Sequence, residues 1–252
     1  MKNKIVDCQE EEYWFPYHYV SKMPELGFRQ HFLDSWGINY ISTIEFMLSR
    51  LGNVESESII DIGCGDGRLT REIALSINPT TLVGVDYSSR AIKLAQAMNQ
   101  DLERASFHAT DITSAHELGS FDAAVLMEVF EHIPLDMANE FMVGVRALIK
   151  PGGRLLLTVP HNNKPVEYKH FQHFSVKSLL KYIEVDFDIV DVVPFERRGL
   201  SRVFLGSLLS NRLFVLNNSR LSNYIYSLHK EHLFFCKNER ECQRIYVEAV
   251  AK

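Results

Sequence analysis

The sequence predicts an α/β fold with a doubly wound parallel sheet, and three stretches support that prediction. Residues 59–62 form a β-branched run that ends in a glycine-rich loop, and helical spacing of apolar residues follows over 68–77. Residues 81–86 have the pattern of a second strand after that helix. The continuous apolar run 121–127 is typical of a central strand covered on both faces. Strands that alternate with helices in this way form parallel sheets.

Length and composition suit a globular protein and disfavour some partners. The chain has 252 residues, 46% hydrophobic and 23% charged, with a net charge of −5. Because no long basic run is present, we do not expect a nucleic-acid partner. The four cysteines lack metal-binding spacing, which favours reduced thiols in a cytoplasmic protein. We expect neither a signal peptide nor a transmembrane segment.

The loop after the first strand carries glycines at positions 63, 65 and 67 and two carboxylates, Asp61 and Asp66. Such a loop before a helix N-terminus is typical of nucleotide-type sites. The glycine spacing is one residue tighter than in the dinucleotide fingerprint, and the carboxylates would repel a pyrophosphate. They suit a positively charged ligand without phosphate, and S-adenosylmethionine (SAM) has those properties. Its product would be S-adenosylhomocysteine.

Two further acids follow strands of the predicted sheet. Asp86 ends the second strand, 19 positions after Gly67, where an acid can bind ribose hydroxyls. Tyr87 is placed to pack on the adenine, and Ser88 is a candidate N-cap for a helix to about residue 99. A short third strand over 106–109 is followed by Asp111.

The motif Asp61-x-Gly63-x-Gly65-x-Gly67 resembles the first motif of class I SAM-dependent methyltransferases. The helix predicted over 135–149, its Pro-Gly-Gly ending and the strand over 154–159 also match that family. The resemblance covers about residues 59–193. It implies seven strands in the order 3-2-1-4-5-7-6, with the last antiparallel, and a contact of Asp111 with the adenine amino group. The expected cofactor-binding residues are Asp61, Gly63, Cys64, Gly65, Asp86, Tyr87, Asp111, Ile112 and Met127.

We expect residues 1–252 to form a single methyltransferase domain with four parts. Residues 1–45 hold an aromatic arm and the start of a helix predicted over 36–51, and 46–193 form the SAM-binding core. The arm is either packed on the surface or a lid over the cofactor. We interpret 194–240 as a cap-like, substrate-side insertion, with a membrane-surface or dimer helix as the alternative. Residues 241–252 form the last strand, after a helix over 175–182 and a strand over 187–193.

The stretch that follows the fourth strand contains the candidate catalytic residues. If residues 128–132 are helical, Glu128, Glu131 and His132 lie on one face, beyond the carboxyl end of the strand. His132 is then the candidate general base and one of the glutamates orients it. The alternative is that Glu131 and His132 only orient the loop.

The leading functional hypothesis is methyl transfer to a hydroxyl or amine of a small molecule, such as a sugar or another secondary-metabolite acceptor. The alternative is a metal-dependent O-methyltransferase. Glu-x-x-Glu-His with a later histidine resembles the ligand set of small-RNA 3′-end ribose methyltransferases and a motif of quinone-pathway O-methyltransferases. That resemblance implies a divalent ion held by Glu128, Glu131, His132 and either His170 or His173, and a vicinal diol such as a catechol or an RNA 3′ ribose. Phe174-Ser175 departs from the RNA enzymes, and we favour His132 as a base without metal.

Two other hypotheses belong to different classes. A SAM-binding partner subunit without catalysis is disfavoured by the intact glycine loop and the Glu-x-x-Glu-His stretch. A nicotinamide-dependent dehydrogenase is disfavoured by the spacing of the loop and its carboxylates. The sequence leaves the acceptor and the oligomeric state open, a dimer included.

Overall fold

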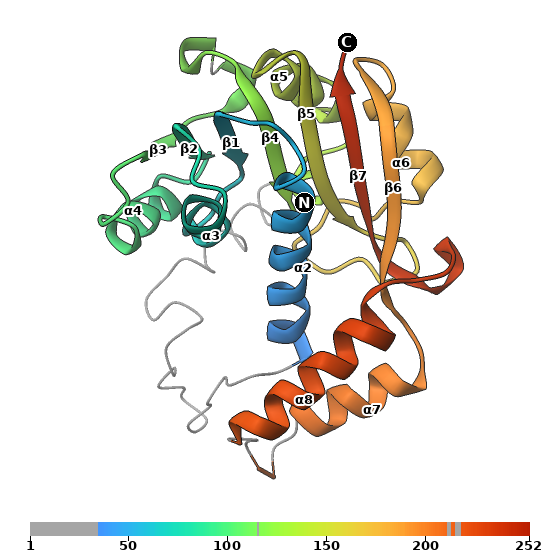
Figure 1. Ribbon diagram of the computed structural model, residues 1–252. Helices are drawn as coiled ribbons and strands as arrows, with labels where there is room; N and C mark the ends of the chain where they lie inside the picture. Colours follow the sequence, from blue (N-terminus) through green and yellow to red (C-terminus); the bar gives the residue numbers. More distant parts are fainter. Residues whose placement is uncertain (1–34, 115, 211–212, 215–217) are drawn as a thin grey trace.

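The structure is a computed structural model, and it describes residues 35–114, 116–210, 213–214 and 218–252 (Figure 1). The predicted aromatic arm therefore lies outside the described residues. Seven strands form one sheet in the order β3-β2-β1-β4-β5-β7-β6. Strand β7 is antiparallel to both of its neighbours, β5 and β6, whereas β1 to β5 are joined by parallel pairs. The predicted fold class, strand order and antiparallel last strand are confirmed.

The strands are β1 Ser58–Ile62, β2 Thr81–Asp86, β3 Ala105–Ala109, β4 Phe121–Met127, β5 Ile149–Pro160, β6 Phe187–Arg197 and β7 Cys242–Ala251. The helices are α2 Ser35–Leu51, α3 Arg68–Ser76, α4 Ser89–Met98, α5 Ala138–Ala147, α6 Val176–Ile183, α7 Leu200–Leu209 and α8 Ser219–His229. Short 3₁₀ turns lie at Ile112–Ser114, His116–Leu118, Phe130–His132 and Glu239–Glu241, and a π turn lies at Lys230–Phe234. None of the helices in these ranges combines the length and hydropathy needed to cross a bilayer.

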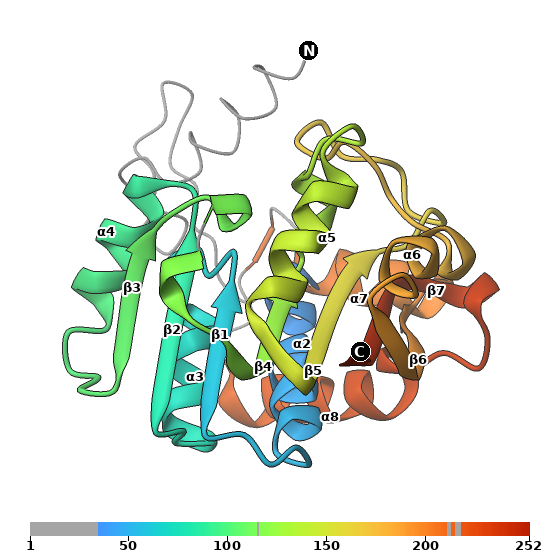
Figure 2. The same ribbon diagram turned by 90° about the horizontal axis from the view of Figure 1, so that it is seen from above.

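Two apolar layers cover the sheet, one on each face (Figures 1 and 2). Helices α2 and α3 pack on one face through residues such as Met47, Leu51 and Ile73. Helices α5 and α6 pack on the other through residues such as Val145 and Leu179. Because both faces of the central strands are buried, those strands read as continuous apolar runs in the sequence.

The boundary between α5 and β5 differs from the sequence prediction. The helix ends at Ala147, and β5 begins at Ile149, ahead of the Pro-Gly-Gly turn that was expected to separate them. Ile149 pairs with Phe121 of β4, and the register shifts between Phe121 and Ala123, so the turn is an irregularity within the strand. Gly152, with φ of 77°, accommodates it.

Strand β6 also runs further than predicted. Residues 194–197, assigned to the insertion from the sequence, pair with β7 as part of the sheet. The segment outside the sheet therefore begins after Arg197. Its helices α7 and α8 lie below the sheet in Figure 1, at the edge where the parallel strands end. That edge is where open α/β sheets bind their ligands.

Candidate active site

A cavity of about 480 Å³ opens at the carboxyl edge of the parallel strands. It is lined by the loops after β1, β2, β3 and β4, by helix α2 and by the loop between β5 and α6. The structure brings every residue predicted to bind cofactor or to act in catalysis to this cavity: Asp61, Gly63, Cys64, Gly65, Asp86, Tyr87, Asp111, Ile112, Met127, Glu128, Glu131 and His132.

The glycine loop after β1 needs glycine for steric reasons at two of its positions. Gly63 has φ of 72°, and a Cβ there would lie 2.5 Å from Cγ2 of Val129. Gly67 has φ of 78°, and its Cβ would lie 2.6 Å from Nδ2 of Asn99. The loop is held to β2 because the N–H groups of Gly63 and Cys64 donate to the Val85 carbonyl, at 2.7 and 3.0 Å. Bare backbone therefore lines this end of the cavity.

Carboxylates give the glycine-loop end a negative character. Asp61 is buried and accepts a 2.6 Å hydrogen bond from the Thr70 hydroxyl. Burial raises the pKa of Asp61 to about 7, and the nearby charges of Asp86 and Asp66 contribute. The Asp86 carboxylate accepts from the N–H groups of Gly65, at 3.0 Å, and Ser88, at 2.9 Å. A cationic ligand would relieve the mutual repulsion of these acids.

The residues expected around an adenine lie beside that end. Tyr87 is about half exposed, and Ile112 is buried. Asp111 is exposed, and its Oδ1 accepts from the backbone N–H and the hydroxyl of Thr113, at 3.0 and 2.9 Å. In the described structure Asp111 thus shapes the turn at the cavity wall, and its contact with adenine stays a prediction.

The stretch after β4 is not one helix, so the predicted common face is wrong for Glu128. Glu128 has φ of 59°, in the left-handed region, and only Phe130–His132 forms a helical turn. The Glu128 Oε2 atom accepts a 2.7 Å hydrogen bond from Nε of Arg244 on β7. A non-glycine residue in this conformation is uncommon and costs free energy, which often marks a functional position.

Glu131 is a buried carboxyl group with no exposed surface. Neither of its side-chain oxygens has a hydrogen-bond partner among the described residues. Burial raises the pKa of Glu131 well above its usual value, and the charge of Glu128 adds to the effect. A buried carboxylate is costly unless a proton or a cation compensates it.

Three histidines follow one another beside this carboxyl group, with His170 between His132 and His173, and their hydrogen bonds indicate which nitrogens carry protons. His173 Nδ1 lies 2.9 Å from the Lys164 carbonyl, which can only accept, so this nitrogen donates. His173 Nε2 then accepts from His170 Nδ1, at 2.7 Å. His132 Nδ1 donates to the Lys169 carbonyl, at 3.2 Å. The Nε2 atom of His170 is then left with its lone pair.

Glu131, His132 and His170 form the group that could hold a metal ion, with one donor atom from each within 4.8 Å of the others. Burial lowers the pKa of His170 to about 3, with His132 contributing, so its imidazole is neutral. The sequence had left His170 and His173 as alternatives. The structure places His170 beside Glu131, and His173 contacts His170 from the other side. Metal-binding histidines commonly donate their second ring N–H to such a partner.

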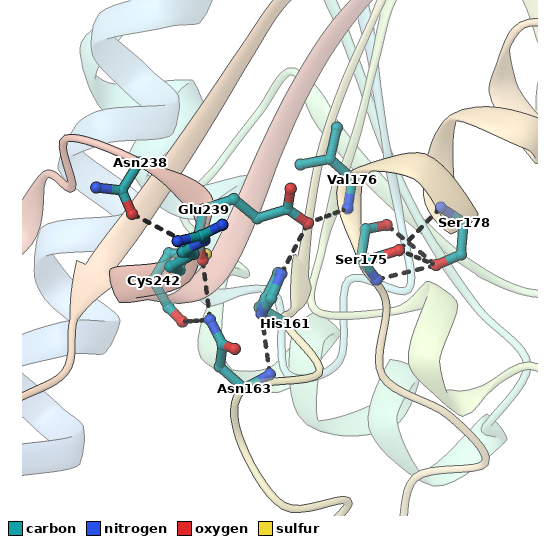
Figure 3. Close-up of polar contacts among 9 residues, drawn as sticks. His161, Asn163, Ser175, Val176, Ser178, Asn238, Glu239 and Cys242 are labelled. Carbon is teal, nitrogen blue, oxygen red and sulfur yellow. Dashed lines mark hydrogen bonds and ion pairs between the residues drawn. The ribbon is translucent and has the colours of Figure 1, made fainter.

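The loop between β5 and α6 that carries these histidines is fastened at several points. The N–H of Phe171 donates to the Glu131 carbonyl at 2.9 Å, which sets His170 beside the turn after β4. At the base of the loop, Glu239 Oε1 accepts from His161 Nε2 at 2.9 Å and from the Val176 N–H at 2.8 Å (Figure 3). His161 is buried in this contact, whereas the Glu239 side chain is 42% exposed.

Several residues of the cavity wall were not found from the sequence. Tyr40 and Thr43 come from α2, Lys164 and Lys169 from the loop after β5, and Arg244 from β7. Arg244 forms ion pairs with Glu128 and with the buried Glu196. One sequence signal existed: Asn39, Ser42 and Thr43 are polar positions on the buried face of α2.

Comparison with known proteins identifies the core of the chain. Residues 60–155 match the family model described as "Methyltransferase domain". The core of the chain thus matches the methyltransferase family, and its sheet has the strand order that the class I resemblance implied. A ubiquinone biosynthesis O-methyltransferase of Leptothrix cholodnii is 28% identical over 145 residues, which cover 56% of this chain and 57% of that protein. One from Ralstonia nicotianae is 32% identical over 108 residues, 42% of this chain and 44% of that protein. The chain thus matches about half the length of these relatives.

Solved methyltransferase structures share the fold at low sequence identity. The N-methyltransferase NodS of Bradyrhizobium japonicum, in complex with S-adenosylhomocysteine, has a TM-score of 0.64 at 14% identity and covers 98% of both chains. Magnesium protoporphyrin IX methyltransferase of Synechocystis with bound SAM has a TM-score of 0.60 at 16% identity, covering 100% of this chain and 97% of that one. This likeness concerns the fold.

Proposed function

We propose that this protein transfers a methyl group from SAM to a hydroxyl group of a small molecule. The observation that carries the proposal is the single cavity that joins an acid-lined glycine loop to the Glu131–His132–His170 group. The names of the relatives, which act as O-methyltransferases in ubiquinone biosynthesis, support an oxygen acceptor.

The glycine-loop end suits SAM better than a dinucleotide. Glycine at position 63 keeps bare backbone at the cavity wall, because a Cβ there would clash with Val129, and the buried acid Asp61 favours a cation. We assign the ammonium group to the acid-lined loop and the ribose hydroxyls to Asp86. SAM supplies an electrophilic methyl carbon on a sulfonium. Because SAM carries no phosphate, the carboxylates of the loop would not repel it as they would repel a dinucleotide.

The residues after β4 would serve the acceptor. The acceptor oxygen forms a bond with the methyl carbon while the bond from sulfur to that carbon breaks, and S-adenosylhomocysteine leaves. His132 Nε2 accepts the hydroxyl proton, because its Nδ1 already donates to the Lys169 carbonyl. Alignment of acceptor and methyl in the cavity supplies much of the rate, on the order of 7–11 kcal/mol in well-oriented systems.

A second candidate is a metal-dependent form of the same reaction, favoured by the unpartnered buried carboxyl of Glu131. One carboxylate and two neutral imidazoles are ligands that manganese, zinc, cobalt or magnesium accepts. Such an ion would lower the pKa of a bound hydroxyl and would suit a vicinal diol such as a catechol. Glu131, His132 and His170 would hold it, and His173 would orient His170.

The insertion would cap the acceptor end of the cavity. Ile225, His229 and Phe234 are buried on the inner side of this segment. Arg202 of α7 donates to Asn39 at 2.6 Å, one position before the cavity-lining Tyr40 of α2, and forms an ion pair with Glu196. This link places the segment next to Arg244, which pairs with the same glutamate.

Binding and turnover would test the proposal in two steps. Calorimetry should give tight binding of SAM and no comparable binding of NAD, and tight NAD binding would contradict the cofactor assignment. Labelled SAM is then offered with catechols, simple phenols, sugars and amines, with and without exhaustive chelation. Transfer to hydroxyls that survives chelation favours His132 as a base; transfer that requires added Mn²⁺ or Mg²⁺ favours the metal site. Tight SAM binding without transfer to any acceptor would leave a partner subunit as the better description.

A further inference from the structure

The outer side of the insertion presents apolar side chains to solvent. Helix α7 has no buried residue, and Leu200, Val203 and Phe204 are 89, 64 and 72% exposed. These positions follow the i, i+3, i+4 spacing of one helical face. An exposed apolar face on a helix is unusual for a surface that contacts only water.

Helix α8 also presents apolar side chains to solvent, but unlike α7 it has buried residues as well. Ile225 and His229 are buried on its inner side, whereas Leu221, Tyr224 and Leu228 are exposed. Between the two helices, Leu213 and Phe214 are also exposed. We call these exposed residues the outer apolar surface; it consists of Leu200, Val203, Phe204, Leu213, Phe214, Leu221, Tyr224 and Leu228.

The stretch that holds α7 and α8 carries charge of one sign, although acids lie on either side of it at Glu196 and Glu231. Residues 197–230 contain five arginines and one lysine but no aspartate or glutamate, in a chain whose net charge is −5. Arg197, Arg202 and Lys230 pair with acids from other segments. Within the described ranges, Arg198 and Arg220 form no ion pair, and Arg220 adjoins the exposed Leu221. The surface is thus apolar with a basic border.

We propose that the outer apolar surface binds a membrane surface that contains anionic lipids, with α7 and α8 lying in the interface plane. Amphipathic helices with leucine and phenylalanine on one side and arginine beside them bind in this way, through apolar burial together with attraction to anionic headgroups. A second copy of the chain fits the surface less well, because a two-fold contact would bring two acid-free, basic segments together.

The position of the surface relative to the cavity agrees with such docking. Arg202 of α7 contacts Asn39 of α2, and the next residue, Tyr40, lines the cavity. In Figure 1, α7 and α8 lie at the edge of the sheet where the parallel strands end. Docking through α7 and α8 would therefore hold the cavity close to the membrane. This inference concerns binding and does not depend on the proposed methyl transfer.

The test is co-sedimentation of the full chain with vesicles of phosphatidylcholine alone or mixed with phosphatidylglycerol. We expect binding to the mixed vesicles, weakening as salt rises, and little binding to phosphatidylcholine alone. Phe204→Ser combined with Leu213→Ser should reduce the bound fraction at least tenfold. Arg198→Gln combined with Arg220→Gln should weaken binding and flatten its salt dependence.

Leu75→Ser is the matched control, because Leu75 is 62% exposed on α3, outside the outer apolar surface. It should bind vesicles like the wild type, and all variants should keep the same circular dichroism. Equal binding by the wild type and both double variants would overturn the proposal. A dimer that Phe204→Ser with Leu213→Ser dissociates, measured by light scattering without lipid, would also overturn it and assign the surface to a second copy.

Discussion

The two ends of the cavity are built in different ways. The glycine-loop end comes from one continuous stretch and the adjacent strand, and backbone N–H groups hold it in place. The acceptor end collects side chains from the turn after β4, from the loop after β5 and from β7, and these side chains contact one another. A site built from the backbone of one stretch can be predicted from the sequence, whereas a site assembled from distant segments depends on how those segments pack. The two ends should therefore respond to mutation in separable ways.

The largest expected effect lies at the acceptor end. His132→Ala should reduce turnover by ~10²–10⁴-fold while SAM affinity stays within about twofold, because the imidazole is lost as a proton acceptor or ligand. His108→Ala is the control, since His108 is exposed on β3. Turnover with saturating acceptor and calorimetry with SAM measure the two quantities. A comparable loss of SAM affinity in His132→Ala would contradict the prediction that the two ends of the cavity respond separately to mutation.

Comparing two histidine variants would sharpen the account of the acceptor end. If a metal is bound, His170→Ala should abolish metal retention, and His173→Ala should weaken it by roughly 10–100-fold, as expected for an outer partner. Metal content after dialysis, measured by mass spectrometry, gives a readout separate from activity. Equal losses in both variants would place His173 among the ligands instead.

The next effect belongs to the glycine-loop end. Gly63→Ala should weaken SAM binding at least about tenfold, because a Cβ would clash with Val129 and left-handed backbone costs ~1–2 kcal/mol. Gly152→Ala is the matched control: it has φ of 77° but no atom within 4 Å of its Cβ. Unchanged SAM affinity in Gly63→Ala would show that the loop does not approach the ligand.

A smaller effect is expected from Glu239, which holds the base of the histidine loop from outside the cavity. Glu239→Gln keeps an acceptor oxygen, so we expect a severalfold rise in KM for the acceptor, whereas Glu239→Ala should raise it further. SAM affinity should not change in either. Glu103→Gln, at an exposed position, is the control. If Glu239→Ala has no effect on KM, the loop is positioned without this contact.

The last prediction concerns the free energy of unfolding and its dependence on pH, rather than turnover or binding. Because the pKa of buried Asp61 is raised to about 7, the folded state binds its proton more tightly than the unfolded state. Asp61 should therefore destabilise the ligand-free protein progressively as pH rises from about 4 to about 7. Asp61→Asn keeps an acceptor for Thr70 and should flatten this slope in denaturant unfolding. A slope that persists in the variant would assign it to another group.

Local patterns predicted many elements closely. The bounds of β2 and β4 agree with the expected runs at both ends, and Ser88 caps its helix as expected. Those features depend on residues close together in the chain. The predicted extent of α5 failed because pairing of Ile149 with Phe121 overrides the local Pro-Gly-Gly signal. Tertiary pairing of strands decides such boundaries.

Spacing alone misled the interpretation of residues 128–132. Helical periodicity grouped Glu128 with Glu131 and His132, but Arg244, more than a hundred residues later, pairs with Glu128 instead. The left-handed backbone at Glu128 accompanies that contact. A period can describe a regular element, but it cannot describe a turn whose conformation depends on a partner from another strand.

The sequence by itself determined the glycine loop and the acids around it, because glycine, β-branched and acidic residues act through local backbone preferences; the strand order followed from the family resemblance of that loop. Only the tertiary structure decided that His170 rather than His173 lies beside Glu131, that Arg244 faces Glu128, and that Glu239 fastens the histidine loop. These contacts depend on which segments meet beyond the strand ends. The free energy of burying their polar and charged groups together cannot be read from residues that are neighbours in the sequence.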